Sequence, residues 1–264
     1  NRELSEFKLK DIDKDKLYTF LREMEFNRLL SSVISAYGEP KLSSSIEEKK
    51  TSEKQQTINK KNYHLITSPD QIDEWIKEAE EVGEVAVDTE TNSLDPHQAD
   101  LVGVSLCSKI GKACYIPIGH KSSKCIDKNI VIKKLKPLLE DPSVKKIGQN
   151  IKFDFIVLYK QGILISSMED TMLMSYVLDA GKNRHNMDTL SEIHLGHKTI
   201  SFKEIVGTGK KEINFSDVEI DKAKDYAAED ADITFRLYKK FIKNLKLEKM
   251  VNIYEIFEKP MIKI

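Results

Sequence analysis

Four carboxylates in three separated motifs have the types and settings needed to bind metal ions together. They are Asp88 and Glu90 in VAVDTET, Asp154 in QNIKFD, and Asp230 in YAAEDAD. Carboxylate oxygens without His or Cys ligands favour Mg²⁺ or Mn²⁺ over structural zinc. Acidic residues are common in this chain, with 43 Asp and Glu among 264 residues. The order and context of the four therefore carry the prediction, rather than their number.

Spacing along the chain places these side chains on shared faces. Asp88 and Glu90 are two apart after the apolar run 85–87, and residues two apart on a strand point to the same side, so both are expected to project from its end. Asn150 and Asp154 are four apart at the start of a predicted helix, so they are expected to share a helical face.

A second helical face carries Tyr226 and Asp230, which are also four apart, and Ile233 and Leu237 continue this stripe to dock the helix on a sheet. The reference pKa of tyrosine is about 10. Near neutrality Tyr226 is therefore better suited to orient a water by hydrogen bonding than to remove its proton. The alternative for Tyr226 is a buried residue on the packed side of the helix.

Each carboxylate also has a structural explanation when it is taken alone. Asp88 can cap a turn, Asp154 can be a first-turn acid favoured by the helix dipole, and Asp230 can belong to a solvated face. Jointly these explanations weaken, because converging carboxylates repel one another and raise their pKa values. Two divalent cations about 3.5 to 4 Å apart relieve that repulsion and act on phosphodiesters. The sequence thus predicts metal-dependent phosphodiester hydrolysis.

The elements that must position these residues follow from hydrophobic periodicity and turn signals. Strands are predicted at 63–67, Glu84–Asp88, Leu101–Cys107, Ala113–Pro117 and 145–148. Helices are predicted from Ser68 or Asp70 to Glu81, then at Asn129–Glu140, Asn150–Gln161, Met168–Asp179, Met187–His194 and Asp221–Lys243, with a last helix interrupted at Pro260. This order predicts an α/β domain with a mixed sheet covered by helices.

The N-terminal part has a different composition. Residues 1–37 contain Leu17, Phe20, Leu21 and Met24 at the spacing of an amphipathic helix. Residues 38–61 are polar, rich in Ser and Lys and free of aromatic residues, which predicts a flexible linker. The main domain is therefore predicted at residues 62–264.

Composition limits the partners. The net charge is −1, so tight gripping of duplex phosphates is not expected. The chain has no apolar run of about 20 residues for crossing a membrane and no cleavage-site pattern. We expect a soluble, cytoplasmic protein that does not bind membranes.

The motifs together resemble those of the 3′-5′ proofreading exonuclease domain of bacterial DNA polymerase I, within the DEDD exonucleases of the ribonuclease H-like fold. The resemblance covers residues 62–264 through VAVDTETNSLDP, KPLLEDPSVKKIGQNIKFD, EDTMLMSYVLDAG, HKTISFKEIVG and YAAEDADIT. The Tyr-x-x-x-Asp form of the third motif is similar to that of the subgroup that uses Tyr rather than His. The fold implied is a ribonuclease H-like mixed β-sheet flanked by helices.

The resemblance also implies roles for the acidic residues. Asp88, Glu90 and Asp230 would bind the more tightly held of two divalent cations, Mg²⁺ or Mn²⁺, and Asp88 and Asp154 would serve the second. Glu90 and Tyr226 would orient the attacking water.

Further positions match substrate contacts of the family. Leu94 matches an apolar residue that wedges between the last bases, and Phe202 matches an aromatic residue near the 3′-terminal nucleotide. Gln149, Asn150 and Arg184 match polar substrate-contacting positions. Without the resemblance, the sequence favours core packing for Leu94 and Phe202.

The flanking segments are similar to parts of the same polymerases. Residues 1–37 resemble the end of a preceding 5′-nuclease module, and YEIFEKPMIKI resembles the start of the polymerase domain. The implied partners are a single-stranded DNA 3′ end and the polymerase and 5′-nuclease modules of the same full-length protein. The fragment itself is expected to be monomeric and without polymerase activity.

The function predicted is removal of deoxynucleoside 5′-monophosphates from single-stranded or frayed DNA 3′ ends. Two alternatives remain open at this point. One is an RNA-trimming exonuclease of the same superfamily, and the other is a catalytically silent domain that binds single strands or braces a polymerase.

Overall fold

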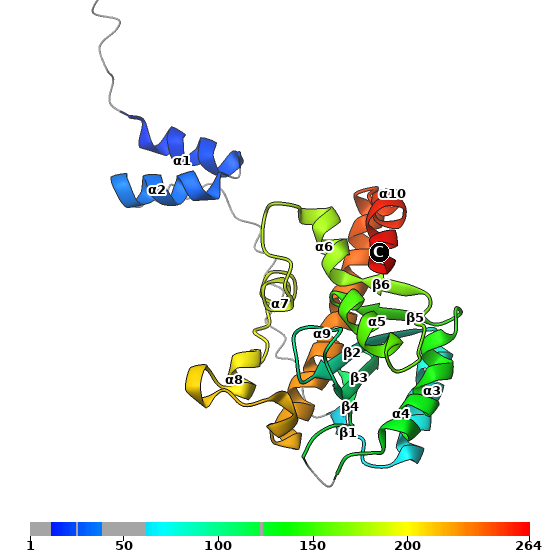
Figure 1. Cartoon of the computed structure of the whole chain (residues 1–264). Coiled ribbons are helices and arrows are strands. Elements are labelled where there is room, and N and C mark those ends of the chain that lie inside the picture. The colour runs from blue at the N-terminus through cyan, green and yellow to red at the C-terminus, as the bar shows by residue number, and fades with distance from the viewer. Residues whose placement is uncertain (1–11, 25, 39–61, 122–123) are drawn as a thin grey trace, which may run out of the picture. The chain divides into compact units, whose positions relative to one another are not determined.

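The computed structural model describes residues 12–24, 26–38, 62–121 and 124–264 (Figure 1). The chain divides into two compact units, Asn1–Glu53 and Lys54–Ile264. Apart from Gly38, the predicted linker 38–61 lies outside the described residues. The division into residues 1–37, 38–61 and 62–264 therefore stays a prediction.

The described part of the first unit contains two helices, α1 (Lys14–Glu23) and α2 (Asn27–Tyr37). Asp13 caps α1 by accepting a hydrogen bond from the Lys16 amide at 3.2 Å, which supplies a partner for a free N–H of the first turn. The predicted apolar stripe is only partly buried: Leu21 is buried, whereas Phe20 and Met24 are 47% and 52% exposed.

The second unit is built on a six-stranded sheet with the order β1-β4-β3-β2-β5-β6. The strands are β1 (Tyr63–Leu65), β2 (Glu84–Thr91), β3 (Leu101–Lys109), β4 (Lys112–Pro117), β5 (Lys145–Gly148) and β6 (Met168–Asp170). β2, β3 and β4 form an antiparallel meander. The other strands pair in parallel: β1 with β4, β5 with β2, and β6 with β5. The predicted mixed sheet is confirmed.

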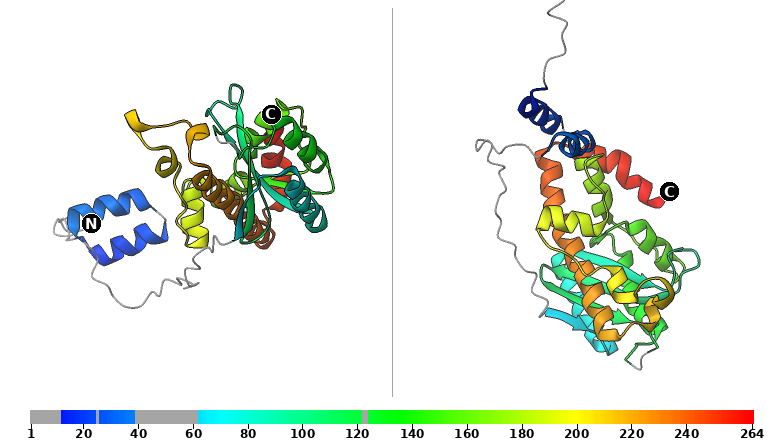
Figure 2. Two further views of the ribbon diagram at one scale, coloured as in Figure 1. Left: turned by 90° about the horizontal axis from the view of Figure 1, so that it is seen from below. Right: turned by 90° about the vertical axis from the view of Figure 1, so that its left-hand side faces the viewer.

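Helices cover both faces of this sheet, as Figure 2 shows. One layer contains α3 (Pro69–Val82), α4 (Lys128–Glu140) and α5 (Ile151–Tyr159). The other contains α6 (Thr171–Asp179), α7 (Met187–Leu195) and the long α9 (Ile220–Leu247). Shorter elements are α8 (Phe202–Val206), η3 (Gly209–Lys211), η4 (Phe215–Asp217), α10 (Val251–Ile253), η5 (Tyr254–Glu258) and η6 (Lys259–Lys263).

Strand β2 illustrates why two helical layers are needed. Val85 and Val87 pack in the core with α3 and α4, whereas Ala86 between them packs in the core with α9. Successive side chains on a strand point to opposite faces. A short run of three apolar residues therefore requires a cover on each side of the sheet.

The predicted helix at Met168–Asp179 is wrong over its first three residues. Met168–Asp170 forms the edge strand β6, with Met168 opposite Lys146 of β5. The Asp170 carboxylate then accepts hydrogen bonds from the Met172 and Leu173 amides, which starts α6. A helical pattern does not reveal a three-residue strand, because sheet pairing is a long-range contact.

The sequence predicts that the last helix is interrupted at Pro260, but this residue lies inside the helical segment η6. A π-helical turn, η5, changes to the 3₁₀ segment η6 at Lys259, one residue earlier. Pro260 lies in the first turn of η6, where a missing N–H is tolerated.

Within the part of the chain that the structure describes, no helix combines the length and the apolar composition required to cross a membrane.

A buried carboxylate of α9 ties this helix to the sheet, and its loss is expected to destabilise the domain. Asp232 is fully buried and accepts from Tyr63 Oη at 2.8 Å, the Gly111 amide at 2.8 Å and Arg236 Nε at 3.0 Å. Asp232→Ala leaves these donors without their partner, so we expect a loss of about 3–5 kcal/mol in the free energy of unfolding.

Urea denaturation checks this expectation, with Lys243→Ala, at an exposed position of the same helix, as the control within about 0.5 kcal/mol of the parent. Equal stability of the two variants would contradict it.

Candidate metal centre and cleft

Asp88 and Glu90 lie within β2 and not at its end, because the strand continues to Thr91. They share the side of β2 that carries Ala86, which packs in the core with α9. Opposite Glu90 lies Gly103 of β3. A Cβ at Gly103 would lie 2.1 Å from Tyr115 Oη, so only glycine leaves room for the tyrosine ring beside Glu90.

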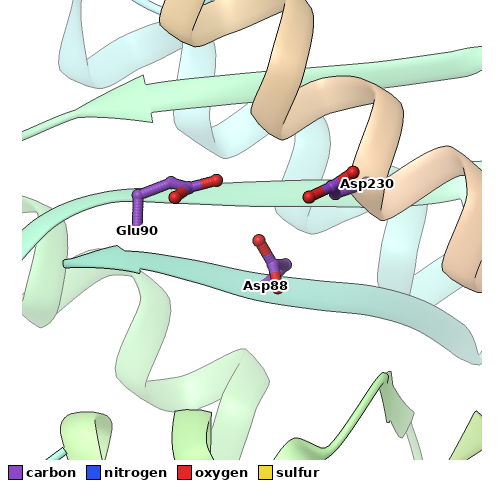
Figure 3. A group of neighbouring side chains, drawn as sticks. All are labelled: Asp88, Glu90 and Asp230. Carbon is purple, nitrogen blue, oxygen red and sulfur yellow. The ribbon is translucent and has the colours of Figure 1, made fainter. Parts of the chain in front are cut away.

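Helix α9 brings the third carboxylate to this face. Ligand oxygens of Asp88, Glu90 and Asp230 all lie within 4.8 Å of one another, and Figure 3 shows the three carboxylates directed toward a common space. Glu90 and Asp230 are buried and Asp88 is partly buried. Tyr226, one turn before Asp230 on α9, lines the same cleft as the three carboxylates.

Asp154 comes from α5 in the opposite layer, and it lies outside the group of three. It is 3% exposed, and its Oδ1 accepts from the Thr89 amide at 2.8 Å and from Thr89 Oγ1 at 2.6 Å. Burial, and after it the charge of Asp88, raises the pKa of Asp154. The structure therefore brings three predicted ligands together and places the fourth beside them.

The predicted helical face shared by Asn150 and Asp154 is wrong. Asn150 is the N-cap of α5, in the left-handed conformation with φ 61°. Asp170 holds this turn, because its carboxylate accepts from the Asn150 amide at 3.1 Å and from the Ile151 amide at 3.0 Å. One carboxylate thus anchors the starts of both α5 and α6. Sequence reasoning missed this role of Asp170.

Burial and mutual repulsion perturb the acidic residues. Burial raises the pKa of Asp88 to about 6. Burial first, and then neighbouring carboxylates, raise the pKa values of Glu90, Asp154 and Asp230 well above the ordinary range. Burial and the three carboxylates around it also raise the pKa of Tyr226. The phenol is therefore protonated at neutral pH.

The donor set fits divalent cations. Glu90 Oε1 is buried and has no hydrogen-bond partner among the described residues, although a buried carboxylate oxygen without a partner is costly. Three convergent carboxylates without His or Cys suit hard ions such as Mg²⁺ or Mn²⁺. A bound cation would relieve the repulsion between the carboxylates and give Glu90 Oε1 a partner.

These carboxylates lie in a cleft of about 1010 Å³. Leu94 and Phe202 also line it. Leu94 is 88% exposed, so the core packing that the sequence alone favoured is wrong for this residue. Phe202 is 40% exposed and its ring stacks on that of Phe215, with centroids 6.2 Å apart and planes 8° apart. The cleft thus presents apolar side chains next to the acidic cluster.

Phe215 is a second feature that sequence reasoning missed. Besides Phe202, its ring contacts those of Tyr226 at 6.0 Å and His120 at 5.7 Å. An aromatic residue among polar neighbours, in NFSD, was the available signal. Phe215 connects the wall of the cleft with the tyrosine beside Asp230.

Glu229 supports the same wall from α9. It is fully buried, Oε1 pairs with His197 Nε2 at 2.9 Å, and Oε2 accepts from the Ile200 amide at 2.7 Å. These bonds hold the segment that leads into α8, which begins at Phe202. The residue next to Asp230 therefore orders a neighbouring part of the cleft.

The three polar positions predicted to contact substrate differ in placement. Gln149 and Asn150 line the cleft, and Gln149 Nε2 donates to the His185 carbonyl at 2.7 Å. Arg184 is exposed between α6 and α7 and is not among the described residues that line the cleft.

A family model described as 3′-5′ exonuclease matches residues 63–246, more than half of the chain. The chain belongs to this family of DNA polymerase A exonuclease domains. As an exonuclease domain it is similar to DNA polymerase I of Rhizobium leguminosarum, with 43% identity over 212 residues, and to DNA polymerase I of Pseudomonas aeruginosa, with 36% identity over 269 residues.

The two alignments cover 72% and 96% of this chain. The exonuclease domain spans only 21% and 29% of the length of these two relatives.

Solved structures agree on the fold. The exonuclease domain superposes on Brucella melitensis NrnC with a TM-score of 0.52 and 25% identity, covering 65% of this chain and 77% of that one. Escherichia coli RNase D gives a TM-score of 0.53 at 18% identity, covering 70% and 46%. The predicted ribonuclease H-like fold is confirmed.

Proposed function

We propose that this exonuclease domain hydrolyses the terminal phosphodiester of single-stranded or frayed DNA 3′ ends and releases deoxynucleoside 5′-monophosphates. The observation that carries the proposal is the convergence of Asp88, Glu90 and Asp230 beside exposed apolar side chains in one cleft. Carboxylates serve the cleavage chemistry, while apolar and aromatic side chains can hold bases without reading their sequence.

Asp88, Glu90 and Asp230 would hold one divalent cation, and Asp88 and Asp154 a second. As Mg²⁺ or Mn²⁺, these ions would supply the charge that stabilises the attacking and leaving oxygens of the phosphodiester. NrnC has also been solved with bound Mg²⁺. At 24% identity, its similarity to this chain is one of fold.

The chain's own residues orient the reactants. Tyr226 keeps its proton because its pKa is raised, so it positions the attacking water by hydrogen bonding and does not act as a base. Glu90, whose carboxylate lies beside those of Asp88 and Asp230, would accept a hydrogen bond from the same water. Leu94 and Phe202 hold the last bases so that the terminal phosphodiester reaches the carboxylates.

The work of this domain would be proofreading within a DNA polymerase I. Similarity to two such polymerases supports this, and the partners proposed are the polymerase and 5′-nuclease modules of the same full-length protein. A cytoplasmic location and a monomeric state remain part of the proposal.

Matched single strands of DNA and RNA test the proposal. The purified chain, supplied with Mg²⁺ or Mn²⁺, is expected to shorten single-stranded DNA from its 3′ end, one nucleotide at a time. It should hydrolyse DNA faster than RNA. Chromatography identifies the released product as a deoxynucleoside 5′-monophosphate. Faster hydrolysis of RNA would favour an RNA-trimming enzyme, and no hydrolysis by the folded chain would favour a silent binding domain.

Phe202→Ala is expected to weaken binding of a single-stranded 3′ end without unfolding the domain. Stacking of a base on an aromatic side chain contributes about 1–3 kcal/mol, so KM should rise by roughly 5-fold or more. Steady-state hydrolysis of an oligodeoxynucleotide measures this. Leu164→Ala, at a residue that is 57% exposed outside the cleft, is the control, and an unchanged KM for Phe202→Ala would contradict the stacking role.

A further inference from the structure

Strand β2 continues beyond its parallel partner β5. The pairing of the two strands ends at Ala86 and Ile147, whereas β2 runs on to Thr91. Backbone groups on this edge past Ala86 need other partners, because a buried N–H group without one costs about 1–3 kcal/mol. The Thr89 amide finds its partner in Asp154 Oδ1 at 2.8 Å.

The Thr89 hydroxyl donates to the same oxygen at 2.6 Å. Thr89 is 6% exposed and Asp154 is 3% exposed, so these bonds are shielded from water. Because side chains alternate along a strand, Thr89 points to the layer of α5, away from the face that carries Asp88 and Glu90. Thr89 therefore connects the strand of the acidic cluster with the helix of Asp154.

We propose that Thr89 is a positioning residue that fixes Asp154 through Oδ1 and so presents Oδ2 to a divalent cation beside Asp88. This rests on the proposed function, in which Asp154 serves the second cation. Two donors on one oxygen fix both the place and the rotation of a carboxylate, whereas the amide alone leaves rotation free. The β-branched Thr89 has few side-chain rotamers, so its hydroxyl is itself held in place.

Thr89→Val and Thr89→Ser separate the hydroxyl from the shape of the side chain. Valine keeps the volume and suits a strand, but it removes the donor, while serine keeps the donor. Partners that orient a metal ligand typically change metal affinity or activity by about 10–100-fold. We expect that loss in kcat for Thr89→Val with single-stranded DNA and Mn²⁺, with KM unchanged and with recovery in Thr89→Ser.

A direct contact between Thr89 and DNA is the rival explanation, because Thr89 also lines the cleft. The rival predicts a rise in KM. It also predicts that Thr89→Val acts equally in the parent and in an Asp154→Ala background. The positioning role predicts that Thr89→Val has no further effect once Asp154 is absent, because residues that act through one another are not additive.

A second readout does not depend on nuclease activity. Mn²⁺ alone, titrated into the chain, raises its melting temperature, and Thr89→Val should move the Mn²⁺ dependence about 10-fold or more to higher concentration, with no further shift in the Asp154→Ala background. Equal Mn²⁺ dependence of the parent and a folded Thr89→Val variant overturns the proposal, as do fully additive effects of Thr89→Val and Asp154→Ala. If the parent hydrolyses no DNA, the proposed function fails, while the Mn²⁺ titration still decides the role of Thr89.

Discussion

Asp230→Asn is expected to lower the rate of hydrolysis of a single-stranded DNA 3′ end by about 1000-fold or more, because several kcal/mol of charge stabilisation are lost. Asparagine keeps the size of the side chain and removes its charge. Because ligand oxygens of Asp230, Asp88 and Glu90 lie within 4.8 Å of one another, the loss acts on the whole cluster. Single-turnover hydrolysis with Mg²⁺ or Mn²⁺ measures the rate.

The chain offers a matched control in its other Asp-x-Glu pair, Asp217 and Glu219. Asp217 forms an ion pair with Lys121 and lies outside the convergent group. Asp217→Asn should retain the parent rate. If Asp230→Asn keeps more than a tenth of the parent rate while it remains folded, the carboxylate cluster is not the catalytic centre.

The second large effect is on stability, and it depends on pH and on divalent cations. The pKa of Asp88 is raised to about 6, and those of Glu90, Asp154 and Asp230 are raised further above their ordinary values. The folded state therefore binds more protons than the unfolded chain as pH rises above about 4. The contribution of these groups to stability is present at low pH and is lost as pH rises through about 6 and beyond.

Mg²⁺ or Mn²⁺ should oppose this loss, because cations bind the deprotonated carboxylates. At 100 times the dissociation constant the gain in the free energy of unfolding is about 2.7 kcal/mol. Thermal denaturation between pH 4.5 and 8.5, with a chelator or with Mg²⁺, measures both effects.

The difference in thermal stability between the parent and Asp230→Asn separates the effect of the cluster from that of other titrating groups. One such group is His120, whose pKa is lowered by burial. Without cations, Asp230→Asn should be more stable than the parent at pH 8, and cations should stabilise it less. A parent that gains stability relative to Asp230→Asn as pH rises in the presence of chelator would contradict the predicted strain.

Local patterns were sufficient for most elements and for the identity of the acidic residues. The strand before Asp88 and the long helix that carries Tyr226 and Asp230 follow from short apolar runs and helical spacing, which depend only on neighbours in sequence. Features that depend on distant contacts did not follow. The strand Met168–Asp170 depends on its partner β5, and the left-handed turn at Asn150 depends on Asp170. The exposure of Leu94 depends on where segments distant in sequence pack.

Residue type and local spacing are properties of the chain, and they were enough to identify Asp88, Glu90, Asp154 and Asp230 as candidate ligands. How the four carboxylates meet depends on the fold. Asp88 and Glu90 face α9 and converge with Asp230, whereas Asp154 approaches from α5 and is held by Thr89. Which layer covers each face of β2 depends on contacts between residues far apart in sequence, and no local spacing encodes these contacts.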